Sequence, residues 1–154
     1  MYRIEGLSPT AFEALAGLSD AQLAELGAMR VTADAKPGFP CRVTLEDAEP
    51  GESLLLLNHV SHDVATPYRT AFAIYVRERA STPALFEDTL PPVFACRTLS
   101  LRGYDARGML RQAVLALPDE GEGRIKELFE RPEVATIHVH TAASGCFVAR
   151  VERN

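Results

Sequence analysis

Two neighbouring segments near the carboxy terminus constrain the fold most, because apolar and polar side chains alternate in both. Apolar residues recur at every second position in 135–140 and again in 146–151, and the five residues TAASG separate the two segments. Period-two alternation is typical of a strand with one buried face, and a five-residue connection suits a β-hairpin. The sequence therefore predicts an antiparallel hairpin here.

The expected register of this hairpin pairs His140 with Cys146 and His138 with Val148. One face is then wholly apolar and is predicted to join the core: Ile137, Val139, Phe147, Ala149 and Val151. The other face, on the side away from that core, carries His138, His140, Cys146, Val148 and Arg150. A slip of one residue would mix the two sets, which favours this register.

Strand patterns also dominate the middle of the chain. Four further strands are predicted, at 41–45, 54–57, 71–77 and 93–101. The run 54–57 is apolar at every position, so we expect it to be a central strand covered on both faces. The polar stretch 58–69 separates two of these strands, and the stretch 81–92, which contains three prolines, is predicted as a loop.

Helix signals begin near the amino terminus. Ser8 and Pro9 can start a short helix that ends at Gly17. Ser19 and Gln22 have the spacing of a capping box, which predicts a second helix as far as Gly27. We expect these helices to cover a sheet.

Two more helices are predicted in the second half of the chain. Asp105 can cap a short helix that runs through Leu110. Over 123–131 the side chains of Ile125, Leu128 and Phe129 form one apolar stripe, and Pro132 ends that helix. All these elements predict an α+β fold, with a largely antiparallel sheet, short helices and a carboxy-terminal hairpin.

Length and composition indicate a single domain over 1–154, with a helical amino-terminal segment at 1–30 and a mixed α+β core at 31–153. No repeat, low-complexity stretch or long linker divides the 154 residues, and 47% of them are apolar, enough to form a core without a metal or disulfides. The three cysteines are widely spaced and form no CxxC pair, which argues against a disulfide framework.

Charge and hydropathy exclude several classes of partner. The formal net charge is −5 and no basic run is present, so neither nucleic acid nor an anionic membrane surface is an expected partner. The longest apolar run, 71–76, is far too short to span a membrane, and the amino terminus lacks the apolar core of a signal peptide. Cytoplasmic residence is therefore the expectation.

All four histidines lie beside predicted strands and suggest a metal site. His138 and His140 have HxH spacing on one strand face, whereas His59 and His62 have HxxH spacing after the run 54–57. If the two motifs converge, they can bind zinc or another divalent ion, and a bound water can become a hydrolytic nucleophile that Asp63 or Arg150 assists. The alternative is that the motifs lie apart and the histidines are solvent-facing or structural.

Other polar residues suggest nucleophilic chemistry or ligand binding. Cys146 opposite His140 can form a thiolate and base pair, or it can simply be a small residue after the loop glycine. Donors for a carboxylate or phosphate ligand are available in Arg42, Asn58, His59, Tyr68, Arg69 and Arg150. The alternative is that the arginines pair with surface acids. No phosphate-binding glycine loop, GxSxG elbow or HExxH motif is present.

Five segments in this order resemble a bacterial family of about this length, domain of unknown function 1203. They are PGFPCRVTLEDAEPGES, LLLLNHVSHD, TPYRTAFAIYVRE, LRGYDARGML and VATIHVHTAASGCFVARVER. The resemblance covers roughly residues 20–153, and the HVH and GCF elements of 137–153 are its most specific part. Two departures from the expected pattern are Thr66 in place of a serine and 71–73 in place of a glycine-containing stretch. The resemblance implies a stand-alone soluble bacterial protein and transfers no substrate, cofactor or catalytic residue.

Three functions follow as hypotheses. The first is a domain that binds a small polar or anionic ligand on the hairpin face with His138, His140 and Cys146. The second is a metal-assisted hydrolase that uses the four histidines. The third is an interaction protein that forms a homodimer through the hairpin face or an exposed sheet edge.

Overall fold

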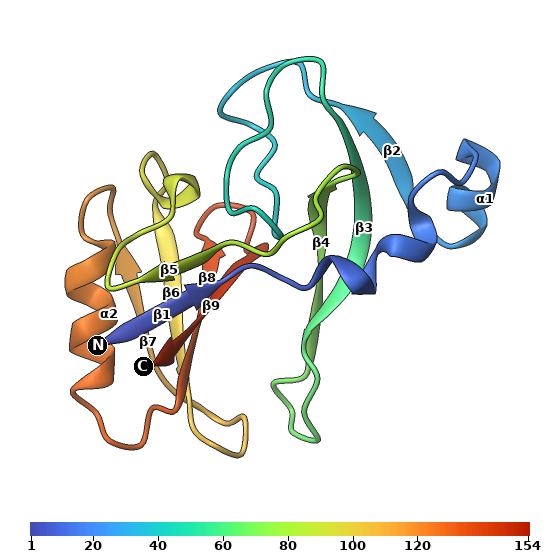
Figure 1. Ribbon diagram of the computed structural model, residues 1–154. Helices are drawn as coiled ribbons and strands as arrows, with labels where there is room; N and C mark the ends of the chain where they lie inside the picture. The colour runs from blue at the N-terminus through green and yellow to red at the C-terminus, as the bar shows by residue number, and fades with distance from the viewer.

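The computed structural model describes residues 1–154 and contains two antiparallel sheets (Figure 1). The larger sheet has six strands in the order β5-β1-β9-β8-β6-β7. Its strands are β1 (Tyr2–Glu5), β5 (Leu85–Glu87), β6 (Leu99–Tyr104), β7 (Leu110–Ala116), β8 (Thr136–Thr141) and β9 (Phe147–Arg153). Because β1 pairs with β9, the two chain termini lie side by side in Figure 1.

The smaller sheet has three strands in the order β2-β3-β4. They are β2 (Met29–Thr32), β3 (Ser53–His62) and β4 (Thr70–Arg77). Its middle strand is covered on both faces, as predicted: Leu54 packs with Ala33 and Ala48, whereas Leu55 packs with Leu23 and Ala28.

Two short α-helices cover the sheets, α1 (Asp20–Glu25) and α2 (Gly121–Phe129). Three 3₁₀ turns accompany them, η1 (Pro9–Ala11), η2 (Glu13–Leu15) and η3 (Pro92–Phe94). The predicted capping box is present, because Ser19 accepts from the Gln22 amide and the Gln22 side chain accepts from the Ser19 amide. Neither α-helix approaches the length that a bilayer crossing requires.

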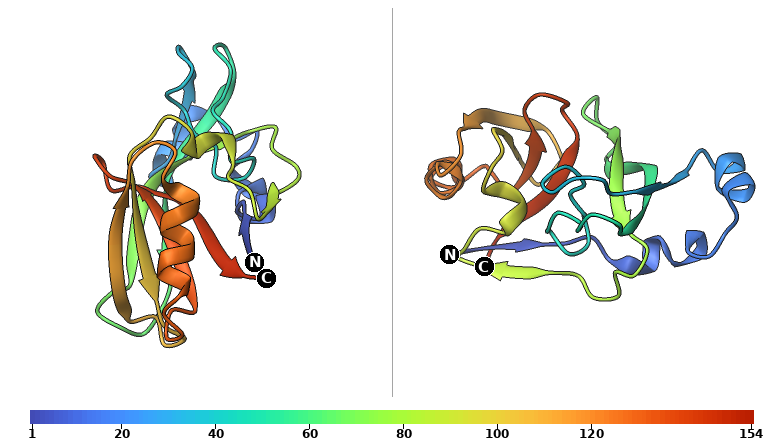
Figure 2. Two further views of the ribbon diagram at one scale, coloured as in Figure 1. Left: turned by 90° about the vertical axis from the view of Figure 1, so that its left-hand side faces the viewer. Right: turned by 90° about the horizontal axis from the view of Figure 1, so that it is seen from above.

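The main core lies between α2 and one face of the six-stranded sheet. Sixteen buried residues form it, among them Leu101, Ile125, Leu128, Ile137 and Val139. Figure 2 shows α2 on this side of the sheet and the three-stranded sheet on the other side. The predicted α+β fold, largely antiparallel with short helices and a carboxy-terminal hairpin, is confirmed at this level.

The amino-terminal third departs from the prediction in two places. Residues 1–30 are not simply helical, because they begin with β1, and 3₁₀ turns replace the first predicted helix. Residues 41–45 form a tight loop with only isolated bridges, and Leu45 has a positive φ of 53°. The alternating apolar side chains are nevertheless buried, because Cys41 and Val43 pack under the small sheet while Leu45 joins the main core.

Three other segments also differ from the prediction. Strand β3 continues through the polar residues to His62, and residues 93–101 divide into η3 and β6. The stretch 81–92 contains the short strand β5. Asp105 caps no helix: its carboxylate accepts from the amides of Arg107 and Met109 in the turn between β6 and β7. A carboxylate that bonds amides just ahead of it stabilises a turn as readily as a helix start.

Candidate functional site: a histidine seam between the two sheets

The face of the six-stranded sheet opposite α2 packs against β3 and β4 through aromatic and imidazole rings, and we call this contact the seam. Its rings belong to His62, Phe72, Tyr104, His138, His140 and Phe147. The ring centroids of His62 and His138 are 4.8 Å apart, and those of Phe72 and His140 are 5.0 Å apart. Three of the four histidines therefore meet where the two sheets pack.

The hairpin that carries two of these histidines is confirmed, but its register is not the predicted one. His138 lies opposite Arg150 instead of Val148, and His140 lies opposite Phe147 instead of Cys146. A bulge after Val139 exchanges two side chains between the faces. Phe147 joins the histidines and Val148 joins the main core. Arg150 stays with His138, and Ile137, Val139, Ala149 and Val151 stay in the main core, as the alternation predicts.

The histidine face is covered rather than open to solvent. His138 is 3% exposed and His140 is 0% exposed, because β3 and β4 pack over them. The chain thus buries both faces of its central strands, one against α2 and one in the seam. A single amphipathic hairpin does not reveal such a second covering layer.

His140 has one satisfied and one unsatisfied ring nitrogen. Its Nδ1–H donates to the Gly145 carbonyl, 2.9 Å away, and this assigns the lone pair of the neutral ring to Nε2. Nε2 is buried and has no hydrogen-bond partner. Burial lowers the pKa of His140 to about 4, so the ring is neutral at pH 7.

His138 is also neutral and incompletely bonded. Its Nδ1 is buried without a hydrogen-bond partner. Burial lowers the pKa of His138 to about 3, and the nearby His62, His140, Arg150 and Arg102 lower it further in the same direction. At neutral pH the ring can therefore accept one hydrogen bond and donate another.

His62 connects the small sheet to the turn between β6 and β7. Its Nε2–H donates to the Gly108 carbonyl at 3.0 Å, and its ring lies 4.1 Å from that of Tyr104. Gly108 has a φ of +81°, and an added Cβ there would lie 2.7 Å from a Val64 methyl. Only glycine allows this turn to approach the end of β3 so closely.

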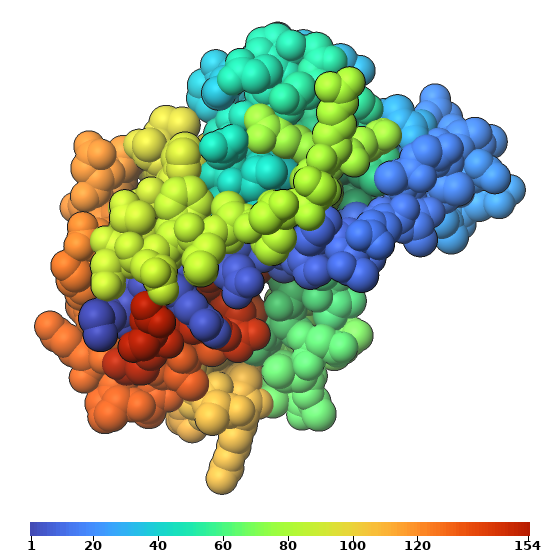
Figure 3. Space-filling model, in the orientation of Figure 1, coloured from blue at the N-terminus to red at the C-terminus, as the bar shows by residue number.

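A cavity of about 480 Å³ opens where the seam reaches the surface. Its walls are the end of β3, the β6–β7 turn, the start of β8 and one side chain of β9. Polar wall residues are Ser61, His62, Asp63, Asp105, Thr136, His138 and Arg150. In Figure 3 the β6–β7 turn (gold) and the segment after β3 (green) stand beside each other at the lower edge of the molecule.

Two residues of the cavity walls each carry a polar atom that lacks a hydrogen-bond partner. The atoms are the Ser61 hydroxyl oxygen and the His138 Nδ1, both fully buried. The two wall carboxylates are already engaged: Asp63 pairs with Arg69 at 3.0 Å and Asp105 with Arg111 at 2.5 Å. The cavity-wall residues that have unused hydrogen-bonding groups are therefore a serine and a neutral histidine, not the two carboxylates.

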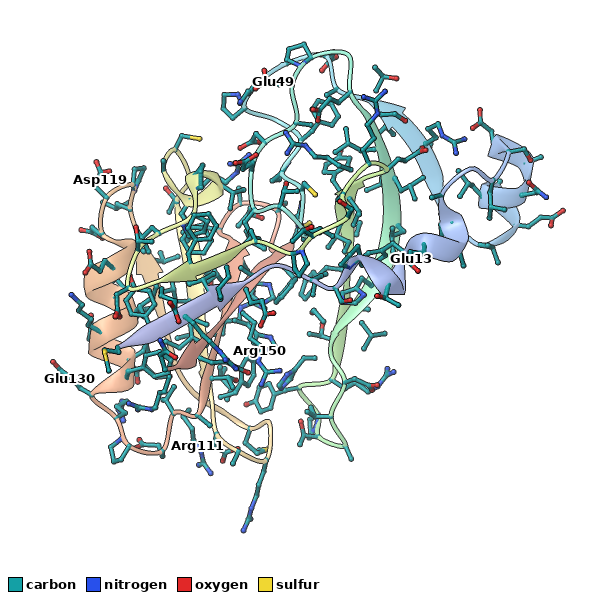
Figure 4. All side chains as sticks on the ribbon, in the orientation of Figure 1. Glu13, Glu49, Arg111, Asp119, Glu130 and Arg150 are labelled. Atoms are coloured by element: carbon teal, nitrogen blue, oxygen red, sulfur yellow. The ribbon has the colours of Figure 1, made fainter.

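Arginines surround the two buried histidines. Arg42 is buried, and its Nε and Nη1 donate to the carbonyls of Phe147 and Pro40 at 2.7 and 2.5 Å. Burial lowers the pKa of Arg42 to about 10, which leaves it charged at neutral pH without a carboxylate partner. Arg102 lies over the Phe72 ring, also without a carboxylate partner, whereas Arg150 pairs with Glu152 at 2.8 Å. Figure 4 labels Arg150 on the side of the sheet that faces β4.

Several residues predicted for the site lie elsewhere. The ring of His59 contacts Phe12, with centroids 5.8 Å apart, and none of the other histidines. Asn58 is exposed. Tyr68 is also exposed, but its ring lies 6.3 Å from that of Tyr104 in the seam, and Arg69 pairs with Asp63 of the cavity wall. Cys146 is half-buried and does not line the cavity.

The predicted convergence of all four histidines is therefore not found. His59 is separated from the other three, and no three His, Cys, Asp or Glu side chains are grouped in a way that could hold a metal ion. The reason is geometric: His59 packs toward the amino-terminal turns, whereas the bulge after Val60 turns His62 into the seam.

Sequence reasoning missed four residues of the seam: Ser61, Phe72, Arg102 and Tyr104. Arg102 and Tyr104 alternate with Leu99 and Leu101, so the period of β6 places them on the face opposite the core. That signal was available in the sequence, but nothing in it indicated that another sheet covers this face.

A protein-family model described as "Protein of unknown function (DUF1203)" matches residues 38–153. The chain belongs to this family. The matched region holds every residue of the seam and begins later than the roughly 20–153 expected from the resemblance. No curated protein and no solved structure gave a significant match.

Proposed function

We propose that this protein binds a small polar molecule in the cavity at the end of the seam. The observation that supports this most is that Ser61 and His138 both line the cavity and that each carries a buried polar atom without a hydrogen-bond partner, Oγ and Nδ1. A buried polar group left unsatisfied costs about 1–3 kcal/mol, so two such groups on residues of one cavity wall favour an occupant that these side chains can bond.

The size and composition of the cavity agree with such an occupant. Its volume of about 480 Å³ lies within the range of small-molecule sites in proteins. The Ser61 hydroxyl can donate and accept, and the neutral His138 ring offers one donor and one acceptor. Apolar contacts come from Val60, Val64, Ala106 and Ala135.

The proposal keeps part of the predicted ligand face and moves its centre. His138 and Arg150 line the cavity, whereas His140 and Cys146 lie toward the hairpin loop and do not line it.

The test is a screen of small polar compounds, in sets of neutral, cationic and anionic members, read by thermal stabilisation and confirmed by NMR titration. We expect a bound compound to shift the His138 ring signals in the NMR spectrum. Ser61→Ala should lower the affinity for that compound about tenfold, because it removes one hydrogen bond in a desolvated site.

Ser144→Ala is the matched control, since Ser144 is an exposed hydroxyl of the hairpin loop. It should leave the affinity unchanged. The proposal is overturned if no set contains a binder, or if every binder has the same affinity for the two serine variants and leaves His138 unperturbed.

A further inference from the structure

Strand β7 leaves one edge of the six-stranded sheet open. It is the last strand in the sheet order and pairs with β6 alone, and in Figure 2 it lies at the outer margin of the sheet. In an antiparallel edge strand, every second residue directs its N–H and C=O groups away from the neighbouring strand. No loop or turn forms a backbone hydrogen bond with residues 110–116. A row of unpaired donors and acceptors therefore runs along the outer side of β7.

The other sheet edges are short or covered. Strand β5 has three residues and β2 has four. Strand β4 is longer, but the loop before β3 covers its outer side: the Arg42 N–H donates to the Tyr75 carbonyl at 3.1 Å, and the Arg77 N–H to Cys41 Sγ at 3.3 Å. Strand β7 has seven residues, no proline and no lysine, so it lacks the usual protection of an exposed edge.

The side chains of β7 make this edge apolar. Ala113 and Leu115 are exposed, Leu115 to 61%, whereas Val114 between them packs against the main core. The only charged residue of the strand is Arg111, which is held in an ion pair and lies at the bulge near its start. The regular part of the edge, 112–116, thus carries no charge, although the chain as a whole has a net charge of −5.

From these features we propose that two copies of the chain associate by pairing β7 with β7 in antiparallel orientation, about a two-fold axis at Val114. The two six-stranded sheets then become one continuous sheet. This names the edge for the homodimer that was one of the three hypotheses from the sequence. The proposal does not depend on the ligand cavity, because no residue of β7 lines it.

The sequence of β7 is complementary to itself in this register. Residues opposite each other must lie on the same face of the combined sheet, so the axis passes through a residue position. With the axis at Val114, Leu115 lies opposite Ala113 of the partner subunit, which sets a large side chain beside a small one. No two like charges lie opposite each other within 112–116.

The neighbouring registers fit less well. An axis at Ala113 places Leu115 opposite the bulged Arg111 of the partner subunit. An axis at Leu115 places Gln112 opposite Pro118 of the partner subunit, which has no N–H to donate. A pairing limited to 112–116 and its flanks is small for a dimer interface, so we expect monomer and dimer to exchange in the micromolar range.

The experiment measures the mass of the full chain by sedimentation velocity, from low micromolar to millimolar concentration. A reducing agent is present, because Cys96 is exposed and can cross-link two copies. We expect the mass to rise with concentration from 16.8 kDa toward twice that value.

Two matched variants test which edge is responsible. Leu115→Lys should weaken the dimer about tenfold or more, because it places a charge in the centre of the edge. Leu85→Lys makes the same change in β5, at the opposite edge of the sheet, where the leucine is 57% exposed. It should change the dissociation constant less than about twofold.

A charge exchange tests the register. The double variant Ala113→Lys with Leu115→Lys should stay monomeric, as should Ala113→Glu with Leu115→Glu, because each sets like charges opposite each other. An equimolar mixture of the two should form a dimer, because lysine then lies opposite glutamate. Circular dichroism verifies that both double variants are folded.

Three results would overturn the proposal. The first is a chain that stays monomeric over the whole concentration range, in which case the edge is open to a strand of another protein and the assignment to a second copy is wrong. The second is a dimer that Leu115→Lys leaves unchanged or that Leu85→Lys dissociates instead. The third is a mixture of the folded double variants that stays monomeric.

Discussion

The two faces of the six-stranded sheet are buried in different ways. The face under α2 is covered mainly by apolar side chains such as Leu101, Ile137 and Val139, and the Tyr2 hydroxyl is the one buried polar atom of this core that has no partner. The seam face is covered by rings and cations, with His138 and His140 each keeping one unbonded nitrogen. Burial under α2 stabilises the fold, whereas the seam retains polar groups that stability alone does not require. That difference is the reason to look for function in the seam.

The largest effect is expected on the α2 face. Ile137→Ala should destabilise the protein by about 2–5 kcal/mol, because it leaves a cavity in a fully buried position. Urea unfolding followed by circular dichroism measures this change. Val60→Ala, at an exposed position of β3, is the control and should change stability by less than about 0.5 kcal/mol. Similar losses of stability in the two variants would contradict the expected difference between a core position and a surface position.

Acid should destabilise the protein through the seam. The folded state keeps His138 and His140 neutral, with pKa values of about 3 and 4, whereas both titrate near pH 6.5 in the unfolded chain. Below about pH 6.5 the unfolded state binds more protons than the folded state. The free energy of unfolding therefore decreases as the pH is lowered, by about 2–3 kcal/mol in total between about pH 7 and 5.5. Burial also lowers the pKa of His59, which adds a smaller term of the same sign.

The control for the pH effect is a double variant, His138→Gln with His140→Asn, which removes both titrating rings and keeps a donor for the Gly145 carbonyl. Its free energy of unfolding, measured in urea at the two pH values, should depend much less on pH. An equal dependence in the variant and the natural chain would show that the seam histidines are not the groups responsible.

A substitution at Gly108 should weaken the packing between the two sheets. Gly108→Ala should cost about 2 kcal/mol or more, since it combines a left-handed backbone with a Cβ 2.7 Å from Val64. Gly17→Ala places alanine at a similar φ of +78° with nothing within 4 Å and should cost only about 1 kcal/mol. The melting temperatures of the two variants are the measurement. Equal decreases in melting temperature would mean that the turn does not pack tightly against the end of β3.

The smallest effect is expected at Ser61. In the ligand-free protein Ser61→Ala should leave stability unchanged or raise it by up to about 1 kcal/mol, because it removes a buried hydroxyl that has no partner. Ser144→Ala, which breaks the contact of Ser144 with Thr141, should instead lower it slightly. Chemical denaturation of the two variants gives the comparison. A marked loss on Ser61→Ala would show that this hydroxyl has a structural partner.

Local patterns predicted a large part of the fold. The hairpin, the middle strand of the small sheet, the capping box of α1 and the buried stripe of α2 are all present. Each depends on residues close in sequence, where the periodicity of a strand or helix and the chemistry of a cap act directly.

The errors arose where distant contacts decide the local structure. Polar residues 58–62 continue a strand because β4 pairs with them, and Asp105 stabilises a turn because β6 and β7 pair on either side of it. The bulge that exchanges Phe147 and Val148 depends on what packs above each face, and a hairpin considered alone does not reveal that.

Part of the residues now found around the cavity had been singled out in the sequence. His62, Asp63, His138 and Arg150 line the cavity, and Arg42 and His140 lie in or beside the seam. The sequence also placed His59 with them, and it left out Arg102 and Ser61. Residue type and spacing indicate which side chains are able to bind a ligand, but they do not indicate which of them face the same space.

The sequence by itself determined which side chains of each strand share a face, because side chains on a pleated strand alternate with a period of two. It thereby separated an apolar set from a set containing His138 and Arg150. Only the tertiary structure decided that β3 and β4 cover the second set, that His62 joins it and that a cavity remains at its end. The physical reason is that packing between sheets depends on register, bulges and close backbone approach at positions such as Gly108, which join segments far apart in the chain.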